Sequence, residues 1–106
     1  MLAAELQMPL FVHERDVDSS RGVPLGSHAD LVAILERARV QPEQVVIHCF
    51  TGEADQLDDY VQRGFRIGLT GFVAMRERGA HVRAALAAGR LPLSRLMLET
   101  DAPFMK

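Results

Sequence analysis

Four short apolar segments, separated by segments of helical pattern, constrain the fold more than any other feature of this sequence. The apolar segments span residues 9–13, 44–50, 65–70 and 94–100. Continuously apolar strands of this kind are typical of a parallel sheet that helices cover. The intervening helices are expected at residues 27–39, 53–63 and 77–88. The alternation β-α-β-α-β-α-β therefore predicts an α/β fold with a parallel sheet.

Residues at the expected helix ends refine this prediction. Ser27 is expected to cap the first long helix, with Asp30 completing a capping box. Gly64 and Gly89 are expected to end the next two helices. Residues 17–26 carry Asp, Ser, Gly and Pro in quick succession and are expected to form a loop.

Composition narrows the class of protein. The chain has 106 residues, of which 48% are hydrophobic and 25% charged, with a net charge of -2. These values are typical of a single globular domain. Lys106 is the only lysine, so no broad basic face for nucleic acid is expected. Any nucleic-acid contact should be local.

Three further features bear on the compartment. Cys49 is the only cysteine, so no intrachain disulfide can form, which fits a reducing compartment such as the cytoplasm. No apolar run approaches the roughly 18 residues that span a bilayer, so no membrane partner is expected. The N-terminus lacks the pattern of a signal peptide.

Three candidate metal ligands follow or end the expected strands. They are His13, His48 and Asp101. The carboxyl ends of parallel strands share one edge of the sheet, where active sites of β/α folds lie. Two imidazoles and a carboxylate suit Zn²⁺, Mn²⁺ or Fe²⁺. The sequence therefore predicts a metal site at this edge.

Each candidate also has an ordinary structural interpretation. His13 could be a solvated residue at a strand end, and His48 could be a neutral core histidine. Asp101 precedes Ala-Pro and could set a turn. Glu99 shares a strand face with Asp101 and could orient a ligand or a water, or pair with an arginine. Arg15 could bind a phosphate through two hydrogen bonds of its guanidinium, or it could form a surface ion pair.

The remaining polar candidates are expected to be structural. Cys49 follows His48 and should point to the opposite face as a packed thiol. His28 and His81 lie in expected helices and are expected to be solvated. The glycines Gly68 and Gly71 lack the Lys-Ser/Thr ending of a phosphate loop, and close backbone approach is the simpler interpretation.

Four motifs occur in order and resemble the TatD family of metal-dependent deoxyribonucleases. They are Leu10-Phe-Val-His-Glu-Arg15, Val46-Ile-His-Cys-Phe-Thr-Gly52, Ile67-Gly-Leu-Thr-Gly71 and Leu96-Met-Leu-Glu-Thr-Asp-Ala-Pro103. The resemblance covers nearly the whole chain apart from the loop near residues 17–27. His-Cys-Phe-Thr-Gly and Glu-Thr-Asp-Ala-Pro are the most specific of these motifs.

The resemblance implies a TIM-type barrel of the amidohydrolase-like kind that hydrolyses phosphodiester bonds of DNA. It further implies two divalent metal ions per site, Mg²⁺, Mn²⁺ or Zn²⁺, in a complete member. By position in the motifs, His13 and His48 would be metal ligands. Asp101 would be both a ligand and a catalytic residue, with Glu99 in a supporting catalytic role. Apart from the resemblance, Arg15 is expected to contact the DNA substrate, because a guanidinium can bind a phosphate through two hydrogen bonds.

Two family features do not occur in the sequence. The family begins with a His-x-His pair, and a glutamate in a Gly-Glu-Ile-Gly-type segment bridges its metals. A barrel takes about 250 residues and eight strands, whereas this chain offers four. We therefore expect residues 1–106 to form a partial domain, truncated at both ends, whose exposed sheet edges favour self-association.

Two other functions are kept beside the nuclease. The chain could be an inactive remnant that binds only a metal or a partner, which the missing His-x-His favours. It could also be an amidohydrolase-like enzyme acting on a non-phosphate substrate, because a fold does not determine a function.

Overall fold

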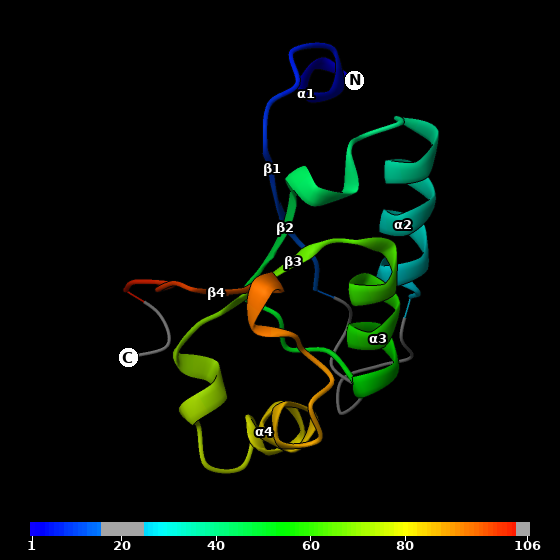
Figure 1. The fold of residues 1–106 in the computed structure, drawn as a ribbon. Coiled ribbons are helices and arrows are strands. Elements are labelled where there is room, and N and C mark those ends of the chain that lie inside the picture. Colours follow the sequence, from blue (N-terminus) through cyan, green and yellow to red (C-terminus); the bar gives the residue numbers. More distant parts are fainter. Residues whose placement is uncertain (16–24, 104–106) are drawn as a thin grey trace.

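The computed structural model describes residues 1–15 and 25–103. Its strands are β1 (Leu10–His13), β2 (Val45–His48), β3 (Arg66–Leu69) and β4 (Leu96–Leu98). They form one parallel sheet in the order β1-β2-β3-β4 (Figure 1). Strand order follows chain order without the reversal of a doubly wound sheet, as in an arc of a β/α barrel. The predicted α/β class and parallel sheet are confirmed.

The helices follow the predicted alternation. They are α1 (Leu2–Glu5), α2 (Ser27–Arg37), α3 (Ala54–Arg63) and α4 (Ala80–Ala87). Short 3₁₀ turns lie at Pro42–Gln44, Gly71–Ala74 and Leu93–Arg95. The first and third of these turns lead directly into β2 and β4 and shorten both strands relative to the prediction. No helix in the described parts of the chain is long and apolar enough to cross a bilayer.

The start of α2 differs from the prediction. Gly26 is the N-cap, in the left-handed region at φ 80°, and Ser27 is the first helical residue. The Ser27 hydroxyl donates to a carboxylate oxygen of Glu14, just after β1, instead of capping the helix. The predicted capping box is therefore wrong, because a tertiary partner takes the hydroxyl. The predicted loop at residues 17–26 lies outside the described residues except for its last two positions.

Helix α3 is closed at both ends by local contacts. Gln56 Oε1 accepts the backbone N–H of Glu53, the N-cap, at 3.0 Å. Gly64 ends the helix at φ 99°, where a side chain would be strained. The predicted boundary at Gly64 is confirmed, whereas the contact between Glu53 and Gln56 was not predicted.

Helix α4 begins at Ala80, three residues later than predicted. A Cβ at Gly79 would lie 2.3 Å from the carbonyl oxygen of Phe72 and 2.9 Å from that of Met75. The chain therefore folds tightly onto the preceding 3₁₀ turn before the helix can start. The Arg83 guanidinium stabilises this turn, donating to the carbonyl oxygens of Val73, Met75 and Arg76 at 2.6–2.8 Å.

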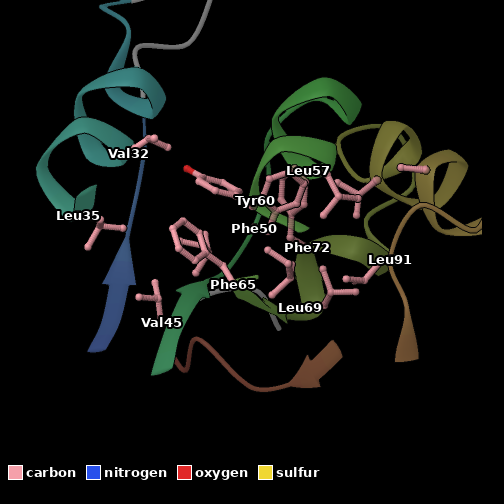
Figure 2. Packing of buried hydrophobic residues seen from close by; sticks show 14 residues of the cluster. Val32, Leu35, Val45, Phe50, Leu57, Tyr60, Phe65, Leu69, Phe72 and Leu91 are labelled. Carbon is pink, nitrogen blue, oxygen red and sulfur yellow. The ribbon is translucent and has the colours of Figure 1, made fainter. Parts of the chain in front are cut away.

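In the described parts of the chain, helices cover one face of the sheet, and we call the other face the open face. Residues of β2 and β3 that point toward the helices are fully or almost fully buried, among them Val45, Ile47 and Ile67. Aromatic and aliphatic side chains from α3 and the following loops pack over them, with Tyr60 and Leu57 at the centre (Figure 2). Alternation sends the intervening strand residues to the open face. That open face carries the chemistry described below.

Candidate functional site

His48, the last residue of β2, lies between two carboxylates. Its Nδ1 is 2.6 Å from Oε1 of Glu99, and its Nε2 is 3.3 Å from Oδ1 of Asp101. The side chains of His48 and Glu99 are 14% and 16% exposed, and that of Asp101 is 30% exposed. Residues more than 50 positions apart in sequence thus meet because β2 and β4 end at the same edge of the sheet.

Glu99 is held by the backbone as well as by His48. Its Oε1 accepts the N–H of Cys49 at 2.8 Å, and its own N–H donates to the carbonyl oxygen of Leu69 at 3.0 Å. Cys49 has a φ of 51°, which is uncommon for a residue other than glycine. Such strain often accompanies functional sites.

The Cys49 thiol points away from the site. Cys49 is 3% exposed, and its Sγ lies 3.3 Å from the hydroxyl oxygen of Thr70. The predicted packed thiol on the opposite face is confirmed. Cys49 therefore contributes its backbone N–H to the open face and its side chain to the covered one.

His13 approaches the same group from β1. It pairs in register with His48, and the two ring centres are 5.7 Å apart. Phe11, two residues earlier, places its ring centre 4.6 Å from that of His48. His13 itself is exposed. The structure therefore brings the three predicted ligands to one edge, with His48 and Asp101 in contact and His13 beside them.

Arg15 is not part of this cluster. It follows β1 and is exposed, and its side chain forms no hydrogen bond within residues 1–15 and 25–103. The structure neither pairs it with a surface carboxylate in this part of the chain nor places it against His48.

The predictions for His28 and His81 were wrong. His28 Nε2 lies 2.9 Å from Oδ2 of Asp59, its ring packs against Tyr60 with centres 4.4 Å apart, and its Nδ1 is buried. His81 Nε2 lies 2.9 Å from the carbonyl oxygen of Thr51. Both side chains contact elements distant in sequence, which no pattern local to their helices reveals.

The donor atoms fit a divalent cation in type and, in part, in arrangement. When Nδ1 of a neutral His48 donates to Glu99, Nε2 presents a lone pair toward Asp101. Two acceptor atoms then face each other, and only a proton or a cation between them makes the contact favourable. The described residues contain no group of three or more His, Cys, Asp or Glu side chains arranged to hold a metal ion. The described part of the chain thus offers part of a ligand set.

Comparison with known proteins identifies the family of this chain. The whole chain, residues 1–106, matches the family described as TatD related DNase. A protein of Dickeya dadantii named 3'-5' ssDNA/RNA exonuclease TatD is 42% identical over 104 residues, and its namesake in Pantoea vagans is 40% identical. These alignments cover 98% of this chain and 35% of each relative.

Solved structures of similar fold include a TatD homolog and an amidohydrolase. YJJV, a TatD homolog from Escherichia coli K12, superposes with a TM-score of 0.75 and 34% identity, over 98% of this chain and 35% of that one. An uncharacterized amidohydrolase from Saccharomyces cerevisiae superposes with a TM-score of 0.65 and 27% identity, over 92% and 30% of the two chains. The chain therefore spans about a third of the length of the proteins it matches. It belongs to the TatD family of nuclease-related, amidohydrolase-like proteins.

Proposed function

We propose that this chain takes part in metal-dependent hydrolysis of DNA phosphodiester bonds. The observation that carries the proposal is the contact of His48 Nε2 with Asp101 at the carboxyl edge of the sheet, in a chain of the TatD family. Its relatives are named as nucleases that act on single-stranded DNA and RNA. Proteins of this family are generally metal-dependent.

His13, His48 and Asp101 are the proposed metal ligands. These residues would hold Mg²⁺, Mn²⁺ or Zn²⁺, which would supply a water of lowered pKa and neutralise charge on the phosphate. Hydrogen bonds fix the orientation of the His48 ring before any metal binds. His48 turns Nε2 toward Asp101 because Nδ1 is held by Glu99. Two ions in the complete site would need ligands beyond these three, so weak metal affinity is expected for this chain.

Asp101 and Glu99 are proposed to differ in role. The Asp101 carboxylate is the more exposed of the two and faces the open edge, where it can accept a proton from a water. Glu99 is engaged by His48 and by the Cys49 N–H, which suits a residue that positions His48. Arg15, exposed after β1, is proposed to contact a phosphate of the substrate.

Two further properties belong to the proposal. A cytoplasmic location is supported by the single cysteine, which leaves no intrachain disulfide to protect. Self-association through the sheet is supported by the apolar side chains of Phe11 and Leu98 on the outer strands, which are 63% and 80% exposed.

A second candidate function is an inactive fragment that binds only a metal or a partner. It is favoured by the lack of a complete ligand group in the described residues. It predicts metal binding without turnover.

The deciding experiment follows cleavage of an end-labelled single-stranded oligonucleotide by the 106-residue chain, with Mg²⁺, Mn²⁺ or Zn²⁺ added. Because the ligand set is partial, we expect little cleavage. Any cleavage should be abolished by EDTA and lowered about 100-fold by Asp101→Asn, which keeps the shape of the side chain but loses its charge. Asp55→Asn, which changes an exposed carboxylate in the first turn of α3, is the matched control and should cleave normally.

Cleavage that survives both EDTA and Asp101→Asn would exclude the proposed chemistry. If the folded chain cleaves nothing but still binds metal, the second candidate function holds. Both outcomes require circular dichroism that shows the variant chains folded like the wild type.

A further inference from the structure

The carboxylate of Glu99 has a fixed position on the open face of the sheet, next to His48, Cys49 and Gly68. Its Oε1 lies 2.6 Å from Nδ1 of His48 and accepts the Cys49 N–H at 2.8 Å. The His48 ring and the Cys49 backbone N–H therefore bound this position on one side. Two donors on one oxygen hold the carboxylate on the side of β2, although Glu99 itself follows β4.

Gly68 lies on the other side of the Glu99 carboxylate and leaves space for it because glycine has no side chain. An ideal Cβ at Gly68 would lie 2.4 Å from Oε1 of Glu99, 2.6 Å from its carboxyl carbon and 3.0 Å from Oε2. The nearest atoms that this Cβ would meet all belong to the Glu99 carboxylate. Gly68 is buried in β3, one residue beyond the pair formed by Ile47 and Ile67, and is thus level with His48.

Space, not backbone conformation, requires glycine at this position. The positive-φ glycines of the described chain are Gly26, Gly64 and Gly89. Gly68 is not among them, so an alanine could adopt its backbone angles without strain. The three atoms nearest to a methyl group would all belong to the end of a flexible side chain, and the carboxylate would move sooner than the strands.

We propose that Gly68 is a positioning residue, which keeps a space for the Glu99 carboxylate and so fixes the orientation of His48. The inference rests on the proposed function for its purpose, since His48 Nε2 then faces Asp101 and the metal. Glu99 reaches His48 only while position 68 has no side chain. The predicted effect of Gly68→Ala is therefore the loss of the Glu99 contact to His48, with the sheet intact.

A double-mutant cycle tests this inference. The wild-type chain, Gly68→Ala, Glu99→Ala and the double variant are compared without metal by the ¹⁵N shifts of the His48 ring at one pH. We expect Nδ1 to carry a proton in the wild type because Glu99 accepts it. That signature should be lost equally in Gly68→Ala and Glu99→Ala, and the double variant should match Glu99→Ala, since the methyl group then has nothing to displace.

A second readout uses Zn²⁺ alone as the probe, by competition with a chelator. Loss of a partner that orients a ligand typically weakens metal affinity by about 10- to 100-fold, and Gly68→Ala and Glu99→Ala should both fall in that range. Gly89→Ala is the matched control. Its site has no atoms within 4 Å of an added Cβ, so the His48 signals and the affinity should stay unchanged.

The outcomes separate this inference from the proposed function. An unchanged His48 signature in Gly68→Ala, or a further loss in the double variant beyond Glu99→Ala, overturns the role of Gly68. If the wild-type chain binds no Zn²⁺, the metal proposal fails while the ring signals still test Gly68. If Gly68→Ala alone does not fold, the double variant must fold, and its failure to do so would also overturn the inference.

Discussion

At the residue scale, long-range partners decide what each histidine does. His48 contacts Glu99 and Asp101, His28 contacts Asp59, and His81 contacts the Thr51 carbonyl. Only the first of these is on the open face of the sheet, at the carboxyl edge. The same side chain thus serves as a candidate ligand in one place and as a link between elements in the others.

An ionic group of Asp59, Arg63, His28 and Glu36 contributes to the stability of the fold. Burial raises the pKa of Asp59, but hydrogen bonds and charge from Arg63 and His28 outweigh it and bring the pKa below the usual 3.8. Arg63 Nε donates to both Asp59 oxygens, at 3.0 and 3.1 Å, and its NH1 pairs with Glu36 of α2. The group therefore ties α3 to α2.

The lowered pKa of Asp59 makes the free energy of unfolding depend on pH. A carboxyl group whose pKa is lowered by folding stabilises the fold above its unfolded pKa, and that contribution is lost as pH falls through the folded value. Asp59→Asn should therefore lower the free energy of unfolding at pH 7 and reduce its loss between about pH 5 and pH 2. Urea denaturation at several pH values measures both effects.

The control for this prediction is Asp58→Asn on the same helix. Asp58 pairs with Arg90, but both side chains are nearly half exposed, and such pairs contribute at most about 1 kcal/mol. A stability difference between wild type and Asp59→Asn that is the same at pH 7 and at pH 2 would contradict the proposed linkage.

At the element scale, glycines with positive φ let the chain turn after a helix toward the next strand. Gly64 and Gly89 end α3 and the turn after α4 with φ values of 99° and 75°. They differ in surroundings. A Cβ at Gly64 would lie 3.2 Å from Cβ of Pro42, whereas a Cβ at Gly89 would meet nothing within 4 Å.

This difference gives a matched pair of substitutions. Gly89→Ala should destabilise the chain by about 1 kcal/mol, from backbone strain alone. Gly64→Ala should cost more, because strain is joined by a tight contact with the 3₁₀ turn that leads into β2. Chemical denaturation of the two variants measures the difference, and equal losses would show that the contact with Pro42 is unimportant.

At the scale of the whole molecule, the helices of residues 1–15 and 25–103 cover one face of the sheet. The helices pack their apolar residues over one side, while Phe11, Met97 and Leu98 remain exposed on the outer strands. Exposed strand edges with apolar side chains favour pairing with another chain. The complete relatives are about three times as long as this chain, since it spans 35% of them.

We therefore expect the chain to self-associate with rising concentration, and Phe11→Ser to weaken that association. Leu93→Ser is the matched control, because Leu93 is 86% exposed but lies in a 3₁₀ turn outside the sheet. Sedimentation velocity at a series of concentrations measures the change. If both variants associate equally, general hydrophobicity and not the sheet would be responsible.

Local patterns in the sequence determined the alternation of strands and helices, the end of α3 at Gly64, and the position of His13, His48 and Asp101 near strand ends. These depend on residue periodicity, on the φ that glycine tolerates, and on the shared edge of parallel strands, which are properties of short segments. The family motifs, carried by the same segments, were confirmed by the match over residues 1–106.

Only the tertiary structure decided which side chains meet. The position of the Glu99 carboxylate beside Gly68, the contacts of His28 and His81, and the hydrogen bond of Ser27 to Glu14 all depend on elements packed together from separate parts of the chain. A single sequence states that Gly68 lacks a side chain, but not what fills the space. That space is defined by neighbouring strands, and its occupant comes from a residue 31 positions away by number, Glu99, brought there by the order of the sheet.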